Sequence, residues 1–268
     1  MQPNLTCTTE ELILLLTLCG YQETAKGLGE SVFGEKSTDA WDTLLDGASH
    51  QLMLKGVWDY DKAENDEVPL TNELQDFIKN YASSPHLVRL INQAQDTSLL
   101  FHSVSEDYWI EHIVVNGIIH EFGYVSLKEI KEDIRDFYLI ESPTPLKGSA
   151  FVLTPNQFEL LSDSSNVDIL ANNLEDAPFK DSFINFKEDL NNYKWQLDNI
   201  SRFYLEDSGE ESKMTNILFL LPSKNGIWCI KYIENDNEVF VAFELKDTNS
   251  WIEECMNLFN HTDTPVLN

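Results

Sequence analysis

The sequence predicts an α+β fold: a central antiparallel sheet made of two three-stranded meanders in pseudo-twofold halves, flanked by helical bundles. The first observation is that strand-like segments come in two groups of three: 98–104, 108–115 and 118–125, then 215–221, 227–233 and 238–244. The second is that helical spacing of apolar residues surrounds both groups. The third is that the order helices, meander, helix occurs twice, which is typical of an α+β protein.

The N-terminal helices follow from their end signals. Thr8 and Glu11 have the spacing of a capping box, and Gly20 stands where a helix ends. A second helix starts near Ser37 or Thr38 and ends at Gly56, and a third follows Thr71. The glycine-dotted stretch 23–36 reads as a loop, with a short helical turn as the alternative within it.

The first meander contains the strongest hairpin signal of the chain. Asn116-Gly117 favours a type I′ turn, since this turn needs two positive φ angles. Such a two-residue turn pairs Val115 with Ile118. It therefore predicts that His112 lies opposite Glu121 and that His112 and His120 point to opposite faces.

The second half begins after a break around Pro143 and Pro145, so we expect halves 1–142 and 143–268 that form one integrated domain. Thr154-Pro155 starts a helix, because proline is favoured at the first helical position. The spacing of apolar residues predicts one long helix from about Asp181 to Tyr204.

Composition limits the function classes. The chain has 268 residues, 42% hydrophobic and 11% aromatic, which is enough for a sizeable core. Residues 5–58 have the outline of a nucleic-acid-binding head. However, 18 basic against 46 acidic residues give a formal charge of -28, which repels phosphate. We therefore expect no nucleic-acid partner.

The location expected from the sequence is the cytoplasm. We find no signal peptide, and no apolar run approaches the roughly 20 residues that span a bilayer. The four cysteines are dispersed and read as ordinary thiols in a reducing compartment. We expect no membrane partner.

Motifs that carry chemistry are missing from the sequence. His102, His112 and His120 crowd one hairpin, but the expected register separates His112 from His120, so no metal site is predicted. The glycines around Gly27 lack the context of a phosphate loop, and no cysteine has a sequence neighbour that would activate it. The sequence thus predicts no enzyme, no catalytic residue and no cofactor.

The N-terminal block resembles a known family. It reads Leu5-Thr6-X-X-Thr9-Glu10-Glu11-Leu12, then a helix ending at Gly20, a glycine-spotted loop and a helix ending at Lys55-Gly56. This block is similar to the start of EspG-like proteins, the cytoplasmic chaperones of ESX (type VII) secretion systems. The resemblance covers the whole chain in the order of elements and about the first 85 residues in motif.

The resemblance implies binding rather than catalysis. The client would be a secreted helical-hairpin protein. The composition, rich in Asn, Asp and Ile, favours a substrate of the LXG or Trp-X-Gly type. By the same resemblance, contacts would come from a hairpin tip and a later helical bundle. The candidate residues are Val114, Val115, Ile118, Ile119, Phe179, Phe183 and Trp195. Core packing is the alternative interpretation of each, and the commoner one for apolar residues at regular spacing.

Two other functions stay open. An acidic antitoxin or immunity protein that neutralises a basic toxin suits the charge of -28, because opposite charge speeds association. An N-terminal winged-helix DNA binder is the third hypothesis, and the lack of a basic cluster argues against it.

Overall fold

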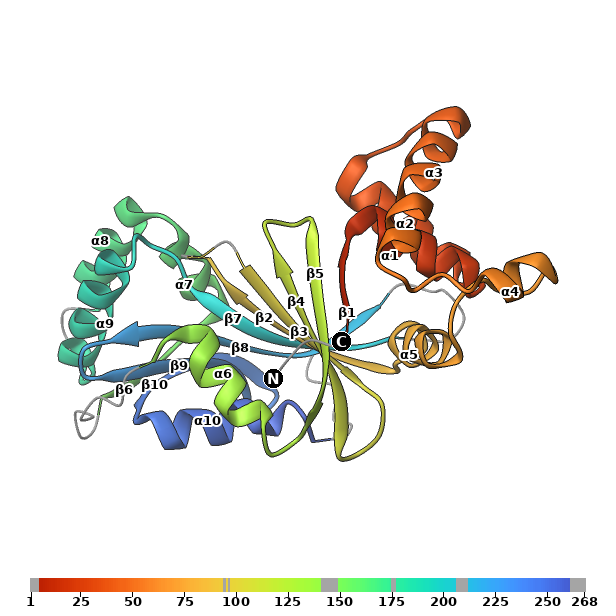
Figure 1. Cartoon of the computed structure of the whole chain (residues 1–268). Helices are drawn as coiled ribbons and strands as arrows, with labels where there is room; N and C mark the ends of the chain where they lie inside the picture. The colour runs from red at the N-terminus through yellow and green to blue at the C-terminus, as the bar shows by residue number, and fades with distance from the viewer. Residues whose placement is uncertain are drawn as a thin grey trace. The chain divides into compact units, whose positions relative to one another are not determined.

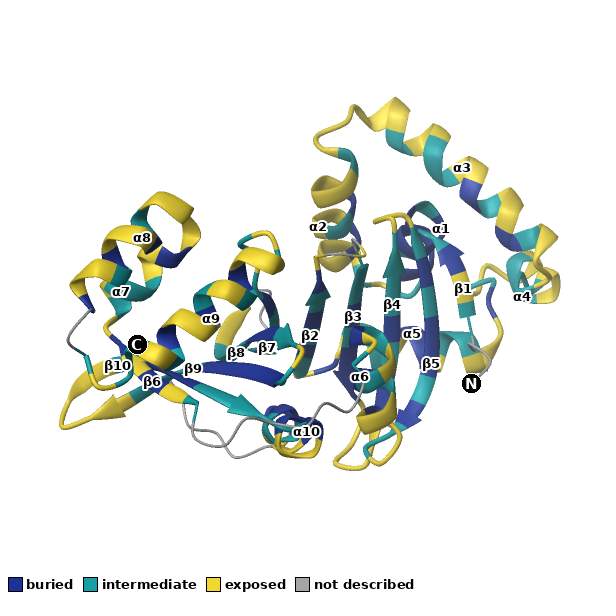
Figure 2. Cartoon of the chain, turned by 90° about the vertical axis from the view of Figure 1, so that its left-hand side faces the viewer, coloured by how far each residue is buried: buried dark blue, intermediate teal, exposed yellow. Residues whose placement is uncertain are grey.

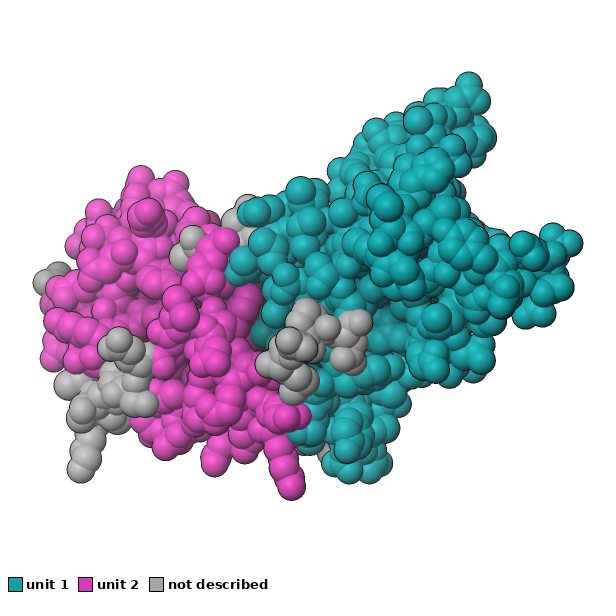
Figure 3. Space-filling model, in the orientation of Figure 1, with its two compact units in different colours: residues 1–87, 97–127, 204–212 teal, residues 88–96, 128–203, 213–268 magenta. Residues whose placement is uncertain are grey.

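The structure is a computed structural model, which describes residues 5–93, 95, 97–140, 149–174, 177–205 and 212–260. The chain divides into two compact units, coloured separately in Figure 3. Unit one consists of residues 1–87, 97–127 and 204–212, and unit two of residues 88–96, 128–203 and 213–268. The break predicted at Pro143 and Pro145, with the boundary after residue 142, lies outside the described residues and stays a prediction.

Unit one combines a group of helices with four antiparallel strands in the order β1-β5-β4-β3 (Figure 1). Its elements are β1 (Leu5–Thr8), α1 (Thr9–Leu18), α2 (Gln22–Phe33), α3 (Thr38–Leu54), α4 (Tyr60–Glu64), α5 (Asn72–Ala82), β3 (Thr97–Ser103), β4 (Tyr108–Val115) and β5 (Ile119–Ser126). The first predicted meander is β3-β4-β5, at the expected place.

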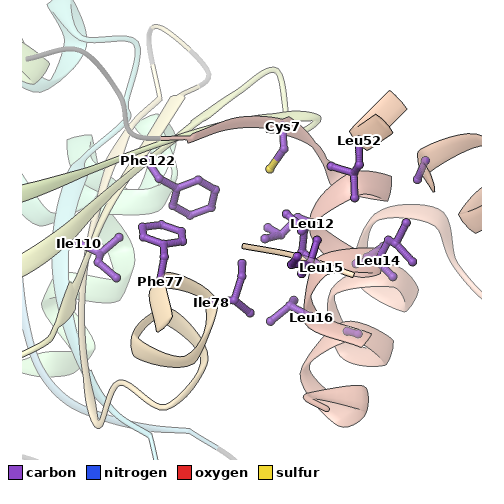
Figure 4. Close-up of a cluster of buried hydrophobic side chains, with 14 residues drawn as sticks. Cys7, Leu12, Leu14, Leu15, Leu16, Leu52, Phe77, Ile78, Ile110 and Phe122 are labelled. Carbon is purple, nitrogen blue, oxygen red and sulfur yellow. The ribbon is translucent and has the colours of Figure 1, made fainter. Parts of the chain in front are cut away.

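Helix α1 is the centre of the core of unit one. Five consecutive residues from Leu12 to Leu16 are buried, because α1 packs against α2, α3 and α5 as well as the strands. In Figure 4, Leu12 and Leu16 lie on the side of α1 toward Phe77 of α5 and Phe122 of β5. The rings of Phe77 and Phe122 meet edge to face, 5.5 Å between centroids, a favoured geometry for aromatic pairs.

The capping box predicted at Thr8 and Glu11 is confirmed. The Thr8 hydroxyl accepts the Glu11 N–H, and the Glu11 carboxylate accepts the Thr8 N–H at 2.7 Å. The Glu11 side chain is fully buried and also pairs with Lys55 Nζ at 2.6 Å. The same ammonium donates to the Thr6 carbonyl at 3.0 Å. These bonds tie β1, α1 and the end of α3 together.

The stretch 23–36 is not the loop that its glycines predicted, since it contains α2. Gly29 lies where a Cβ would come within 2.5 Å of the Trp41 ring, so this glycine permits a close approach of α2 and α3. Phe33 also packs on Trp41, 6.2 Å between centroids. Figure 2 shows that much of α3 is exposed, with Ala48 and Leu52 buried.

Unit two contains six strands in the order β2-β7-β8-β9-β10-β6. Adjacent strands from β8 to β6 pair antiparallel, so the second predicted meander is confirmed as β8-β9-β10. The elements are β2 (His86–Asn92), α6 (Ile130–Tyr138), β6 (Ala150–Leu153), α7 (Pro155–Glu159), the 3-10 turn η1 (Leu160–Ser162), α8 (Ser164–Asn173), α9 (Lys180–Asn192), β7 (Asp198–Tyr204), β8 (Lys213–Ser223), β9 (Gly226–Asn235), β10 (Glu238–Lys246) and α10 (Thr248–Asn257).

An aromatic cluster joins the strands of unit two to its helices. Phe151 of β6 stacks on Phe243 of β10, 4.3 Å between centroids, and contacts Phe183 and Phe186 of α9 edge to face. Trp228 donates its indole N–H to the Asp189 carboxylate at 2.9 Å. Helices α7 to α9 therefore belong to the same core as the second meander.

The long helix predicted from Asp181 to Tyr204 is wrong, because α9 ends at Asn192. Lys194 and Trp195 both have positive φ angles, 57° and 63°, and the Trp195 N–H turns back to the Leu190 carbonyl. This arrangement closes a helix end in the manner of a C-terminal cap. The chain then enters β7, where hydrogen bonding to the neighbouring strands prevails over the helical spacing of its apolar residues.

Lys55→Met tests the buried ion pair. It leaves the Glu11 carboxylate buried with one fewer partner, so we expect a loss of roughly 2–4 kcal/mol in the free energy of unfolding. Chemical denaturation measures it. Lys26→Met is the matched control: Lys26 and Glu30 are 4.0 Å apart, with side chains 65% and 48% exposed. This exposed pair should contribute less than about 1 kcal/mol. Equal losses in both variants would contradict the assigned role of Glu11.

Candidate partner-binding surfaces

The register of the β4–β5 hairpin differs from the predicted one by a residue. Asn116 and Gly117 do have positive φ angles, and the Ile118 N–H closes the turn on the Val115 carbonyl. In the ladder, however, Val115 pairs with Ile119. Ile118 is an extra residue, and its carbonyl accepts the Thr9 N–H beyond β1. A bulge at Ile118 thus shifts every later pair of β5.

This shift corrects the prediction that His112 and His120 face opposite ways. His112 lies opposite Phe122, and both histidines share one face of the sheet, with His112 Nε2 2.8 Å from His120 Nδ1. His120 Nε2 is 3.0 Å from the Thr9 hydroxyl. His102 of β3 stands next to His112, 5.8 Å between ring centroids. All three are buried and form one row under α5.

Burial controls the charge of this histidine row. Desolvation lowers the pKa of His102 to about 3 and that of His120 to about 4, and it lowers the pKa of His112 well below its usual value. Among the residues that the structure describes, neither ring nitrogen of His102 has a hydrogen-bond partner. Nearby Tyr81 and Cys7 have raised pKa values, again chiefly through burial. The row is therefore neutral near pH 7.

The predicted hairpin-tip residues lie on both faces of the sheet. Val114 pairs with His120, whereas Val115 and Ile119 lie opposite each other on the other face. These three side chains are half-buried, and the bulged Ile118 is 51% exposed. The tip therefore presents accessible apolar surface, with Ile118 its most exposed residue.

The three predicted contact residues of unit two belong to one cluster. Phe183 is 1% exposed and packs on Phe151, as the core interpretation expects. Phe179 stacks on the same ring at 6.0 Å and is half-buried. Trp195 is also half-buried and packs against the cluster from its unusual left-handed backbone position. Phe179 and Trp195 keep surface that a partner can reach.

Metal chemistry finds no support within the described ranges. No group of three or more His, Cys, Asp or Glu side chains in them is placed to hold a metal ion. The cysteines there are free thiols, and burial raises the pKa of both Cys7 and Cys229 to about 12, which disfavours the nucleophilic thiolate. Within the part of the chain that the structure describes, no helix combines the length and apolarity needed to cross a bilayer.

The fold defined by these meanders and helices is that of the EspG-like α+β proteins. A solved structure of the Mycobacterium tuberculosis type VII secretion system chaperone EspG5, in complex with a PE25-PPE41 dimer, superposes with a TM-score of 0.59. The match covers 95% of this chain and 95% of EspG5, with 9% sequence identity. The EspG-like resemblance seen in the sequence is thus confirmed at the level of fold.

Family membership follows from the sequence match. Residues 4–250 match the family described as "Uncharacterised protein YfjC". The chain belongs to this YfjC family. No curated protein matches the chain.

The sequence did not predict the buried histidine row or the strands β1, β2, β6 and β7. The buried histidine row depends on the bulge at Ile118, and no local signal marks a one-residue insertion opposite a regular strand. Strand β6 was also missed, although a signal existed, since Ala150 to Leu153 alternate small or β-branched with large residues just before the Thr154-Pro155 helix start. That alternation is the period of a strand with one buried face.

The histidine row predicts a loss of stability in mild acid. In the unfolded chain these histidines bind protons near pH 6.5. In the folded protein the pKa values of His102 and His120 are lowered, so these two residues bind protons only at about pH 3 to 4. Stability therefore falls as the pH falls through this window. At pH 5 the cost is about 2 kcal/mol each for His102 and His120.

His102→Phe checks this dependence by chemical denaturation at pH 7 and pH 5. Between pH 7 and pH 5, the free energy of unfolding of the variant should fall by about 2 kcal/mol less than that of the wild type, because the variant lacks one proton-binding site of the unfolded chain. His50→Phe is the matched control, since His50 is exposed on α3 and should leave the dependence unchanged. An unaltered pH dependence in His102→Phe would show that this residue does not cause the acid sensitivity.

Proposed function

We propose that this protein binds a secreted helical-hairpin protein and holds it before export, in the role of a type VII secretion chaperone. The observation that carries the proposal is the EspG5-like fold, which extends over 95% of both chains. EspG5 itself is seen in complex with a PE25-PPE41 dimer. A fold retained over the whole length favours a related binding role, although fold alone does not define function.

Accessible apolar side chains support a contact with an apolar helical client. Ile118, with its half-buried neighbours Val115 and Ile119, forms the first candidate contact. Phe179 and Trp195 form the second. Exposed large hydrophobic and aromatic residues are the usual anchors of protein interfaces. Phe183 supports the second contact from inside, by packing between Phe151 and the helices.

The client class and the location complete the proposal. An LXG or Trp-X-Gly substrate has the helical-hairpin form that such a chaperone holds, and holding it before export places the protein in the cytoplasm. The charge of -28 keeps the chaperone soluble and away from nucleic acids.

An immunity or antitoxin role is the second candidate, and the net charge favours it. A chain of charge -28 attracts a basic toxin and speeds the encounter. Such a complex would depend on charge more than on the apolar hairpin tip.

Co-expression with LXG and Trp-X-Gly proteins of the same host tests the chaperone role. We expect a stable complex in size-exclusion chromatography. Ile118→Asp should weaken it about tenfold or more, since a buried Ile contributes about 1.5–3 kcal/mol. Leu139→Asp is the control, because Leu139 is 71% exposed at the end of α6 and belongs to neither candidate contact. The proposal fails if no such protein forms a complex.

Salt separates the two candidate functions. An apolar chaperone contact should change its Kd little between 50 mM and 500 mM salt, because screening acts on charges. An immunity complex held by opposite charges should weaken, with the loss mainly in the association rate. Surface plasmon resonance on the co-purified partner measures both constants. A large loss of association rate with salt would favour the immunity role.

A further inference from the structure

Strands β1 and β6 hold equivalent places in the two halves of the fold. β1 pairs with β5, the last strand of the first meander, and β6 pairs with β10, the last strand of the second. Each is an outer strand of the sheet order. Each is followed by a threonine N-cap with a capping box, Thr8 with Glu11 and Thr154 with Gln157. Both outer strands therefore lead into a helix through the same kind of N-terminal cap.

The outer side of β1 is occupied by hydrogen bonds. Because the Thr9 N–H bonds to the Ile118 carbonyl, alternation along an antiparallel pair turns the backbone groups of Thr6 and Thr8 outward. The Thr6 carbonyl accepts from Lys55 at 3.0 Å, and the Thr8 N–H donates to Glu11 at 2.7 Å. The buried Glu11 carboxylate and the partly exposed Lys55 ammonium thus cover this edge, and charged side chains are one of the ways by which proteins prevent strand addition.

The outer side of β6 is different. The Leu245 N–H bonds to the Ser149 carbonyl, so the backbone groups of Ala150 and Val152 point away from β10. The Thr154 N–H donates to the Gln157 side chain at 2.9 Å, but no lysine in the described ranges bonds to the backbone of β6 as Lys55 bonds to that of β1. Within the described residues, no side chain donates to or accepts from the backbone of Ala150 or Val152. The strand also contains no charge, proline or bulge that would prevent pairing.

The side chains of β6 would suit an added strand. Ala150 is exposed and Val152 is 42% exposed on one face, and both are small enough to leave the edge accessible. On the other face, the half-buried ring of Phe179 lies beside the Phe151 ring, 6.0 Å between centroids. An apolar side chain of a neighbouring strand, opposite Phe151, could cover that ring.

We propose that the outer edge of β6 is a docking site for an extended segment of a partner protein, which adds to the sheet as a further strand. The segment places a large apolar residue beside Phe151 and Phe179, and small or β-branched residues beside Val152. Backbone bonds supply affinity and the alternate side chains supply selectivity. The proposal rests on the proposed function in one respect, that the protein binds another polypeptide.

Charge determines the kind of segment. A second copy of this chain would bring another charge of -28 to the edge, which disfavours pairing of β6 with β6. A neutral or basic segment has no such penalty and gains from the field of the acidic chain. The occupant is therefore a neutral or basic extended segment, not a second copy.

The experiment uses the full chain and a short fluorescein-labelled peptide that alternates Phe with Thr or Val between terminal lysines. We expect binding by fluorescence anisotropy, and slower amide exchange at Val152 when the peptide is present. Val152→Lys and Val152→Pro should each weaken binding about tenfold or more. The proline removes an N–H that makes no ladder bond, so β6 can still pair with β10. Should Val152→Pro not fold, Val152→Lys decides.

Val239→Lys is the matched control, because Val239 is 44% exposed on β10 outside the stretch that pairs with β6. It should bind the peptide as the wild type does. A peptide N-methylated on alternate amides should not bind, since it cannot form the backbone bonds. The proposal is overturned if the wild type does not bind, if both peptides bind equally, or if the Val152 variants bind normally. A dimer in light scattering that Val152→Lys dissociates would show that the occupant is a second copy.

The client complex distinguishes the failure of this site from the failure of the proposed function. If the co-expressed client binds but Val152→Lys leaves both its Kd and the peptide Kd unchanged, the β6 site is wrong and the chaperone role stands. If no client binds while the peptide still docks on β6, the chaperone role fails and the edge site stands.

Discussion

The buried carboxylate of Glu11 is the interaction on which unit one depends. It accepts the Thr8 N–H and pairs with Lys55 Nζ at 2.6 Å, with no exposure of its own side chain. One charge thereby fixes the start of α1, the end of α3 and the outer edge of β1. A buried carboxylate is costly unless it is paired. The ion pair therefore makes these three elements depend on one another. Helix α1 contributes the central buried side chains of this core.

The two halves share one order of elements but differ in what lies beside the outer strand. In both, an outer strand leads through a threonine cap into a helix, and a meander closes against that strand. The first half adds α3, whose terminal Lys55 occupies the strand edge. The second half adds α8 and α9, which instead place Phe179 beside β6. The same topology thus yields one closed edge and one edge whose outward backbone groups have no side-chain partner among the described residues.

The shape and the charge of the N-terminal block no longer conflict. Its helices surround α1 in a core shared with β1 and β5, so they do not stand alone as a nucleic-acid-binding head. The fold over the full chain is EspG-like, and residues 4–250 match the YfjC family. An acidic surface with a few accessible apolar side chains is consistent with a protein partner.

The sequence by itself determined both meanders, the helices after Thr8, Ser37 and Thr71, and the caps at Thr8 and Thr154, because periodicity, turns and capping are local. The resemblance to EspG-like proteins offered Ile118, Phe179 and Phe183 alike as contacts, and only the structure separates the accessible Ile118 and Phe179 from the buried Phe183. Only the tertiary structure decided the register of β5, where the Ile118 carbonyl bonds to Thr9 beyond β1 and a bulge brings His112 to His120. It likewise ended α9 at Asn192 and paired β7 in the sheet. These features depend on backbone bonds between distant residues, and local periodicity does not encode them.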